Sequence, residues 1–307
     1  MIRNIYSIFA ISLFLVATHG YSSEQCGDEG VWIQILGAGG SELTDNQASS
    51  SYLVWSDNKA RLLVDTGPGS SVGFDKSGAT FEDLDAIVYT QLRADHSSDF
   101  PAFILASYEL TRTRPLTVIG PSSKEKDAPG LIAFIDRFIG PTGVYPKLAD
   151  SLTFKSTSGY KIRPREAPSS GNRIWARFGT DDMRLSSIPV SHSDTPTIAW
   201  RIDISGHSIV FTGDFNNQKN QISKFAKGAD AIVITHAIPE VSRGKLRERY
   251  VLPSQIGRIA SQANARMIIL GHRTNRTKGR ESQSRLSIEK HYADDIIFAD
   301  DMECWGL

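Results

Sequence analysis

Short apolar runs rich in β-branched residues recur along this chain, separated by turn residues and by segments with a helical pattern. Strands are predicted at 31–40, 51–55, 60–65, 84–89, 115–121, 183–192, 197–204, 208–212, 232–236, 267–272 and 295–301. Helices are predicted after the fourth run and at 131–139, 221–227 and 253–263. Residues 167–180 contain Gly and Ser and indicate a loop. Strands and helices in this order predict an α/β architecture of two face-to-face sheets with helices outside.

Several of these runs lead to residues that can bind a metal or move a proton. They are Asp95 with His96, then His192, Asp214, His236 and His272. The ends of strands are where α/β proteins place their chemistry. A single Asp-His pair in a loop is more often a solvated turn, but five strand ends of this kind form a constellation. We therefore expect them to meet in one site.

The first 22 residues have the pattern of a secretory signal peptide. Arg3 supplies the charged start, residues 5–17 are apolar but short for a membrane span, and small residues near position 20 offer a cleavage point. An uncleaved anchor is the alternative. We expect the mature protein, 23–307, to be exported to the periplasm or the medium and to have no membrane contact.

Charge and cysteine content narrow the range of partners. Lys plus Arg and Asp plus Glu are balanced at 34 each, so no overall field favours nucleic acid or an anionic membrane. Only two cysteines are present, Cys26 and Cys304. In an oxidising compartment such a pair favours a disulfide, which we predict here.

The motifs of the chain resemble those of the metallo-β-lactamase superfamily, nearest its ribonuclease Z and arylsulfatase-like branch. Residues 90–96, Thr-Gln-Leu-Arg-Ala-Asp-His, stand where that family has Thr-His-x-His-x-Asp-His. A later His192, a Gly-Asp pair ending at Asp214 and a late His272 follow in the family's order, and Asp65-Thr-Gly-Pro-Gly69 resembles its Asp-x-Gly-x-Gly loop. The resemblance spans about residues 31–301 and implies a four-layer αββα sandwich in one domain.

The resemblance also implies which metal ligands remain. The family binds two metals, and the ligands of the first correspond here to Gln91, Arg93 and His192. A guanidinium cannot ligate a cation, so this first site is expected to be lost. The second set is complete and consists of Asp95, His96, Asp214 and His272. One divalent cation is expected, with Zn²⁺ as the metal that suits these ligands. A metal-free, hydrogen-bonded cluster is the alternative.

Catalytic roles follow from the same resemblance. Arg93 would stand where the lost cation was and hold a substrate oxygen, unless it is an ion-pair partner of Asp65 or Asp214. His192, freed from metal, is a candidate general base, or else a neutral structural histidine. His236 corresponds to the histidine of the branch's His-Glu-Ala-Thr motif, a proton donor, although the Glu is Ala237 here. Asp95 is expected to serve catalysis as well as metal binding.

Two functions of different class remain open. The first is an exported metal-dependent hydrolase of an ester-like bond, such as a phosphoester or a sulfate ester, in an anionic small molecule. The second is a catalytically degenerate member of the fold that binds a ligand without turnover. Transfer-RNA processing is not expected, because of export, balanced charge and the lack of a Lys-rich, Gly-punctuated arm. No nucleic-acid partner is therefore predicted, and the oligomeric state is left open.

Overall fold

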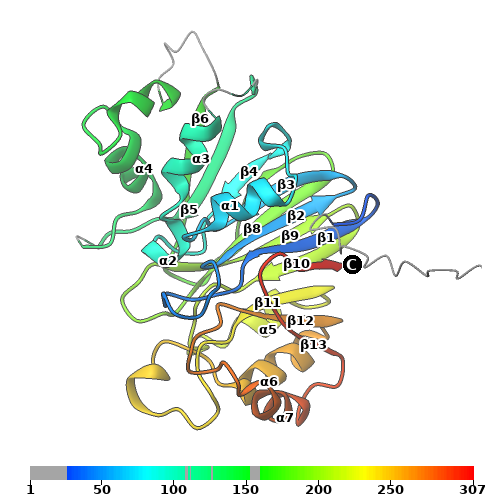
Figure 1. Ribbon diagram of the computed structural model, residues 1–307. Coiled ribbons are helices and arrows are strands. Elements are labelled where there is room, and N and C mark those ends of the chain that lie inside the picture. Colours follow the sequence, from blue (N-terminus) through cyan, green and yellow to red (C-terminus); the bar gives the residue numbers. More distant parts are fainter. Residues whose placement is uncertain (1–25, 108–109, 111, 126, 153–159) are drawn as a thin grey trace, which may run out of the picture.

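The computed structural model describes residues 26–107, 110, 112–125, 127–152 and 160–307. Within them, two seven-stranded sheets lie face to face (Figure 1). The order in the first sheet is β14 (Cys304–Gly306), β1 (Val31–Gly37), β2 (Ser51–Ser56), β3 (Lys59–Val64), β4 (Ala86–Val88), β5 (Leu116–Pro121), β6 (Ile162–Ala167). The order in the second is β13 (Asp295–Phe298), β12 (Met267–Gly271), β11 (Ala231–Thr235), β10 (His207–Phe211), β9 (Thr197–Ile204), β8 (Met183–Val190), β7 (Trp175–Gly179).

Helices cover the outer face of each sheet. Those that follow strands of the first sheet are α1 (Ser70–Lys76), η1 (Phe81–Asp83), α2 (Ala94–Ser97), α3 (Phe100–Ser107), α4 (Leu131–Ile139) and η2 (Pro146–Leu152). Those that follow strands of the second are α5 (Ile222–Phe225), η3 (Gly244–Leu246), α6 (Pro253–Ala263) and α7 (Glu281–Glu289). The predicted helices at 131–139 and 253–263 have the bounds of α4 and α6.

The layers follow from the two-residue period of the strands. In β2, Val54 packs into the core between the two sheets, whereas its neighbour Leu53 packs into the core under the helices of the first sheet. A third core lies between the second sheet and its own helices. Three apolar cores between four layers confirm the predicted αββα sandwich.

Parallel pairing explains why the strand ends converge. Strands β3 to β6 are parallel to one another in the first sheet, as are β10 to β13 in the second. Their carboxyl ends therefore share one edge of each sheet. Asp65 follows β3, Asp214 follows β10 and His272 follows β12, so the fold brings these three positions to the same end of the sandwich.

The prediction of a loop over 167–180 is wrong, because β7 occupies Trp175–Gly179. This edge strand pairs with β8 and has a register shift between Trp175 and Phe178. The shift turns both aromatic side chains toward the core although they are three residues apart. The alternation of apolar and polar side chains that marks a strand is lost at that point, so the sequence pattern does not indicate a strand there.

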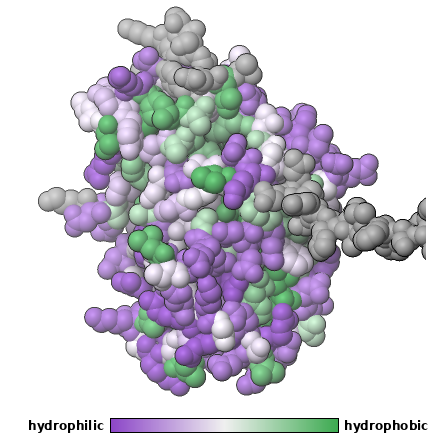
Figure 2. Space-filling view, viewed as in Figure 1, coloured by the Kyte–Doolittle hydropathy of each residue, from purple (hydrophilic) through white to green (hydrophobic). Residues whose placement is uncertain are grey.

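The two ends of the described chain are joined covalently. Cys26 and Cys304 form a disulfide, as predicted, which ties the segment before β1 to β14. The proposed signal peptide, 1–22, lies outside the described residues. Among the described helices, none combines the length and the apolar composition that a membrane span requires. Most of the face in Figure 2 is hydrophilic, and its apolar side chains form separate patches, several of them in the upper part of the view, where α3 and α4 lie.

Candidate metal centre

Asp95, His96 and His272 come together at the shared edge of the sandwich. Each offers one ligand atom, and these atoms lie within 4.8 Å of one another. All three residues are buried, and the rings of His96 and His272 stack with centroids 5.0 Å apart. Asp95 and His96 lie on the short helix α2, whereas His272 follows β12. Three of the four predicted metal ligands therefore form one cluster.

Asp214 is the centre on which the histidines converge. Its Oδ2 atom lies 3.5 Å from His96 Nε2, 3.6 Å from His272 Nε2 and 3.8 Å from His192 Nε2. The side chain is fully buried, and its Oδ1 accepts a hydrogen bond from Thr235. Burial would raise the pKa of this carboxyl, but the facing imidazoles, His272 first, hold that pKa well below its ordinary value.

Each of the three histidines has its other ring nitrogen engaged. His96 Nδ1 lies 2.8 Å from Asp65 Oδ2, His192 Nδ1 lies 3.0 Å from the Arg249 carbonyl, and His272 Nδ1 lies 2.8 Å from Ser50 Oγ. Donation by Nδ1–H leaves the lone pair of each Nε2 facing Asp214. Partners of this kind orient imidazoles as metal ligands.

Asp65 supports the ring of His96. It accepts hydrogen bonds from Thr90 N and Thr90 Oγ1, both at 2.7 Å, in addition to the bond from His96. Its φ of 57° and that of His272, 46°, are in the left-handed region that costs a non-glycine residue about 1–2 kcal/mol. Strained backbone of this kind is common at functional sites. Gly67 permits the close approach of the two loops, since a Cβ there would meet the Asp95 carbonyl oxygen at 2.5 Å.

Two of the separations among the proposed ligands suit one cation. In tetrahedral coordination, Zn²⁺ bonds of about 2.0–2.1 Å place ligand atoms about 3.4 Å apart. The separations of 3.5 and 3.6 Å from Asp214 Oδ2 to His96 Nε2 and His272 Nε2 are close to that value. Asp95 Oδ2 is buried and has no hydrogen-bond partner in the described structure. Such an acceptor is costly to bury unless something binds it.

The position of the family's first metal does not fit a second cation. Among its three corresponding residues only His192 presents an imidazole nitrogen toward the centre. The Gln91 amide nitrogen lies 2.7 Å from His96 Nε2 and 2.8 Å from Asp214 Oδ2. The Arg93 guanidinium adds a positive charge beside His192. The loss of this first site stays a prediction, which metal analysis tests.

Arg93 and His192 lie together at the rim of the cluster. Arg93 Nε lies 3.3 Å from Asp95 Oδ1, and Arg93 Nη1 lies 3.5 Å from His192 Nε2. The sequence left open an ion pair between Arg93 and either Asp65 or Asp214. In the structure, Arg93 pairs with Asp95 instead. Burial opposes the charge of Arg93, but Asp95, Tyr250 and Asp214 together outweigh it and raise the Arg93 pKa. Burial also lowers the pKa of His192, although Asp214 acts to raise it. The His192 ring is therefore neutral near pH 7.

His236 faces away from the cluster. Its Nε2 atom lies 2.8 Å from Ser284 Oγ on α7, and its ring packs against Phe298. The ring is buried, and burial lowers its pKa to about 4. A proton donor must reach the substrate, so His236 has no part in the mechanism proposed below.

Two further groups that contact the histidines of the centre could not be identified from the sequence. The Tyr250 ring lies 5.2 Å from the His192 ring and 6.2 Å from the His272 ring, measured between centroids. The preceding residue, Arg249, supplies the carbonyl that orients His192. A tyrosine and a backbone carbonyl in a loop belong to no ligand motif, so only their position in the fold identifies them.

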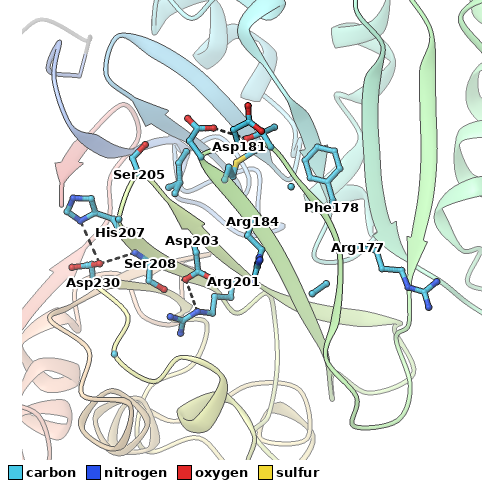
Figure 3. Close-up of a pocket in the computed structure, with 18 residues that line it drawn as sticks. Arg177, Phe178, Asp181, Arg184, Arg201, Asp203, Ser205, His207, Ser208 and Asp230 are labelled. Atoms are coloured by element: carbon cyan, nitrogen blue, oxygen red, sulfur yellow. Dashed lines mark hydrogen bonds and ion pairs between the residues drawn. The ribbon is translucent and has the colours of Figure 1, made fainter.

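A large surface hollow lies elsewhere. It has a volume of about 1210 Å³ and is lined by β7, β8 and the turn between β9 and β10 (Figure 3). That turn precedes β10, whereas Asp214 follows it, so the hollow lies at the opposite end of the strands. Arg201 is paired there with Asp203, and His207 faces Asp230, so these four side chains are engaged with one another.

A model of the β-lactamase superfamily domain matches residues 60–272. The chain belongs to the metallo-β-lactamase superfamily. Its curated relatives include a ribonuclease Z of Clostridium acetobutylicum, 29% identical over 52% of this chain and 46% of that protein. A ribonuclease Z of Mycobacterium avium is 23% identical over 88% of this chain and 96% of that protein. The chain thus spans less than half of the first relative's length. These matches confirm the family inferred from the motifs.

Solved structures agree on the fold. The metallo-β-lactamase fold protein YhfI of Bacillus subtilis superposes with a TM-score of 0.69, at 19% identity, over 90% of this chain and 98% of its own. Zn²⁺-bound PqqB of Methylobacterium extorquens superposes with a TM-score of 0.63, at 13% identity, over 90% of this chain and 100% of its own. At such identities these likenesses establish the fold alone.

Proposed function

We propose that this chain is an exported hydrolase of an anionic ester, a phosphoester or a sulfate ester, that uses a single divalent cation, Zn²⁺. The observation that carries the proposal is the convergence of three imidazole Nε2 atoms on Asp214 Oδ2 at 3.5–3.8 Å. Buried imidazoles and a carboxylate at this spacing are the ordinary components of a zinc site.

The proposed ligands are Asp95, His96, Asp214 and His272. When bound, a divalent cation supplies a Lewis acid and lowers the pKa of a bound water molecule. His192 is farther from Asp214 Oδ2, at 3.8 Å, and lies beside the Arg93 guanidinium. We therefore assign His192 as a general base rather than as a ligand, since its pKa is lowered and its Nε2 lone pair is unprotonated near pH 7.

Arg93 is assigned to the substrate's anionic oxygens. Its side chain is one-third exposed, at 33%, while its Nε is held by Asp95 Oδ1. The guanidinium thus has a fixed position and retains N–H groups that can donate to a phosphate or sulfate oxygen. Charge that develops on such an oxygen during hydrolysis would be stabilised by this preorganised cation.

An exposed basic segment next to the centre also favours an anionic substrate. Arg243, Lys245, Arg247 and Arg249 are exposed and lie on or beside η3. The backbone of the same segment orients the centre, because the Arg249 carbonyl binds His192. In a chain of zero formal net charge, this concentration of cations would attract anions to the mouth of the site.

The test combines metal analysis with a substrate panel. Mature protein purified without chelator should contain about one equivalent of zinc and should hydrolyse a nitrophenyl phosphodiester, phosphomonoester or sulfate faster than nitrophenyl acetate. Removal of the zinc should abolish turnover, and its return should restore it. Two equivalents of zinc would contradict the loss of the first site.

A metal-free binding protein is the second candidate, and the Gln91 amide at the centre favours it. That candidate predicts saturable binding of phosphate or sulfate esters without turnover at any zinc concentration. The relatives called ribonuclease Z make RNA a necessary member of the panel. Our prediction remains a small-molecule substrate, and cleavage of a transfer-RNA precursor at a rate above that of the small esters would overturn it.

A further inference from the structure

Gln91 occupies the position of a metal ligand in its family but contacts the other ligands directly. Its side chain is fully buried, and its amide nitrogen lies 2.7 Å from His96 Nε2 and 2.8 Å from Asp214 Oδ2. Both of these atoms belong to the proposed zinc shell. The same lone pairs therefore serve either the amide or a cation.

The neighbours fix the orientation of the amide. Asp214 is a carboxylate and accepts hydrogen bonds only, so the atom that faces it must be the amide nitrogen rather than the oxygen. The nitrogen carries two hydrogens, one for Asp214 and one for His96 Nε2. The latter is an acceptor because His96 donates through Nδ1 to Asp65.

The oxygen of the Gln91 amide is less well satisfied than its nitrogen. Gln91 Oε1 is buried and has no hydrogen-bond partner in the described structure. A buried acceptor without a partner is destabilising. The two bonds of the amide nitrogen must therefore offset this cost and hold the amide in place. These bonds bridge Asp214 Oδ2 and His96 Nε2, which lie 3.5 Å apart.

We propose that Gln91 is a displaceable internal substitute for the cation. Its amide holds the metal-free centre assembled, and a cation can bind His96 and Asp214 only after both amide hydrogen bonds are broken. Gln91 therefore stabilises the metal-free protein and weakens zinc binding. The proposal rests on the zinc site of the proposed function, but it does not depend on hydrolysis.

The test compares Gln91→Ala with the native protein in zinc titrations against a competing chelator and in thermal unfolding with and without EDTA. The variant should bind zinc at least about tenfold more tightly, because no amide bonds must be broken. In EDTA its unfolding midpoint should fall by about 5 °C, and saturating zinc should remove most of that difference.

Gln34→Ala is the matched control, because Gln34 is equally buried and its Oε1 accepts a hydrogen bond from Trp55 Nε1 at 3.0 Å. It should lower the midpoint equally with and without zinc and leave zinc affinity unchanged. If Gln91→Ala does not fold in EDTA, Gln91→Glu serves instead. Its carboxylate donates no hydrogen bond and adds a ligand, so zinc should stabilise this variant more than the native protein.

The outcomes separate this proposal from the hydrolase. Equal or weaker zinc binding by Gln91→Ala, or the same loss of stability with and without zinc, overturns the role of Gln91 and leaves the hydrolase intact. Tighter zinc binding by the variant, with no turnover by the native protein, supports the role of Gln91 and sinks the hydrolase. No zinc binding by either protein overturns both.

Discussion

Asp65→Asn should reverse the proton position on His96. Asp65 Oδ2 now accepts from His96 Nδ1 at 2.8 Å and from Thr90 Oγ1 at 2.7 Å. The Asn oxygen can replace Oδ1, which accepts from the Thr90 backbone N–H. The Asn NH₂ group then replaces Oδ2 and donates, so His96 Nδ1 must become the acceptor. The ring proton moves to Nε2, the atom proposed to bind zinc.

The substitution changes one further side-chain hydrogen bond, because Thr90 Oγ1 must accept from the Asn NH₂ group instead of donating to Oδ2. Asn has the size of Asp and tolerates the left-handed backbone of position 65, where φ is 57°. Zinc binding to the variant must first remove the Nε2 proton or rotate the Asn. Loss of such an orienting partner typically costs 10–100-fold in metal affinity. This corresponds to about 1.4–2.7 kcal/mol of binding free energy.

Two measurements check the prediction. Chelator competition should show zinc affinity reduced by about 10–100-fold, and nitrogen NMR of labelled histidine should show the His96 proton on Nε2 in the metal-free variant. Asp182→Asn is the control, since Asp182 pairs with Arg61 on a more exposed surface and should leave affinity unchanged. Unchanged zinc affinity together with a proton that stays on Nδ1 would refute the reasoning.

The remaining predictions concern catalysis, the disulfide and pH. Arg93→Ala should lower turnover about 100-fold, while Arg93→Lys retains part of it and both keep their zinc, as kinetics and metal analysis would show. If Arg93→Ala retains full activity, the residue is structural. Replacing Cys26 and Cys304 by Ser should lower the free energy of unfolding by about 5 kcal/mol in denaturant titrations, because the closed loop spans 278 residues; a change below about 1 kcal/mol would contradict the chain-entropy account. The pKa of His236 is about 4 in the folded protein, below its unfolded value of 6.5, so protonation favours the unfolded chain as pH falls between these values. Up to about 3 kcal/mol of stability should be lost over that window, and His236→Gln should flatten the pH dependence of unfolding, which an unchanged profile would contradict.

The layers and strand ends could be predicted from the sequence because their signals are local. Apolar runs and helical spacing reflect the two periods at which side chains return to one face. They placed α6 at Pro253–Ala263 and the ligand-type residues at the ends of strands. Parallel pairing then brings these ends to one edge, so the meeting of Asp95, His96 and His272 follows from the order of the elements.

The detailed interactions were decided by the tertiary structure, because they join residues far apart in the chain. The bond from Gln91 to Asp214 crosses 123 positions, and that from His192 to the Arg249 carbonyl crosses 57. Sequence motifs identified a lost ligand at Gln91, but not that its amide binds the remaining ones. Residue types limit which atoms can donate or accept, and only the packed fold determines which of them come within hydrogen-bond distance.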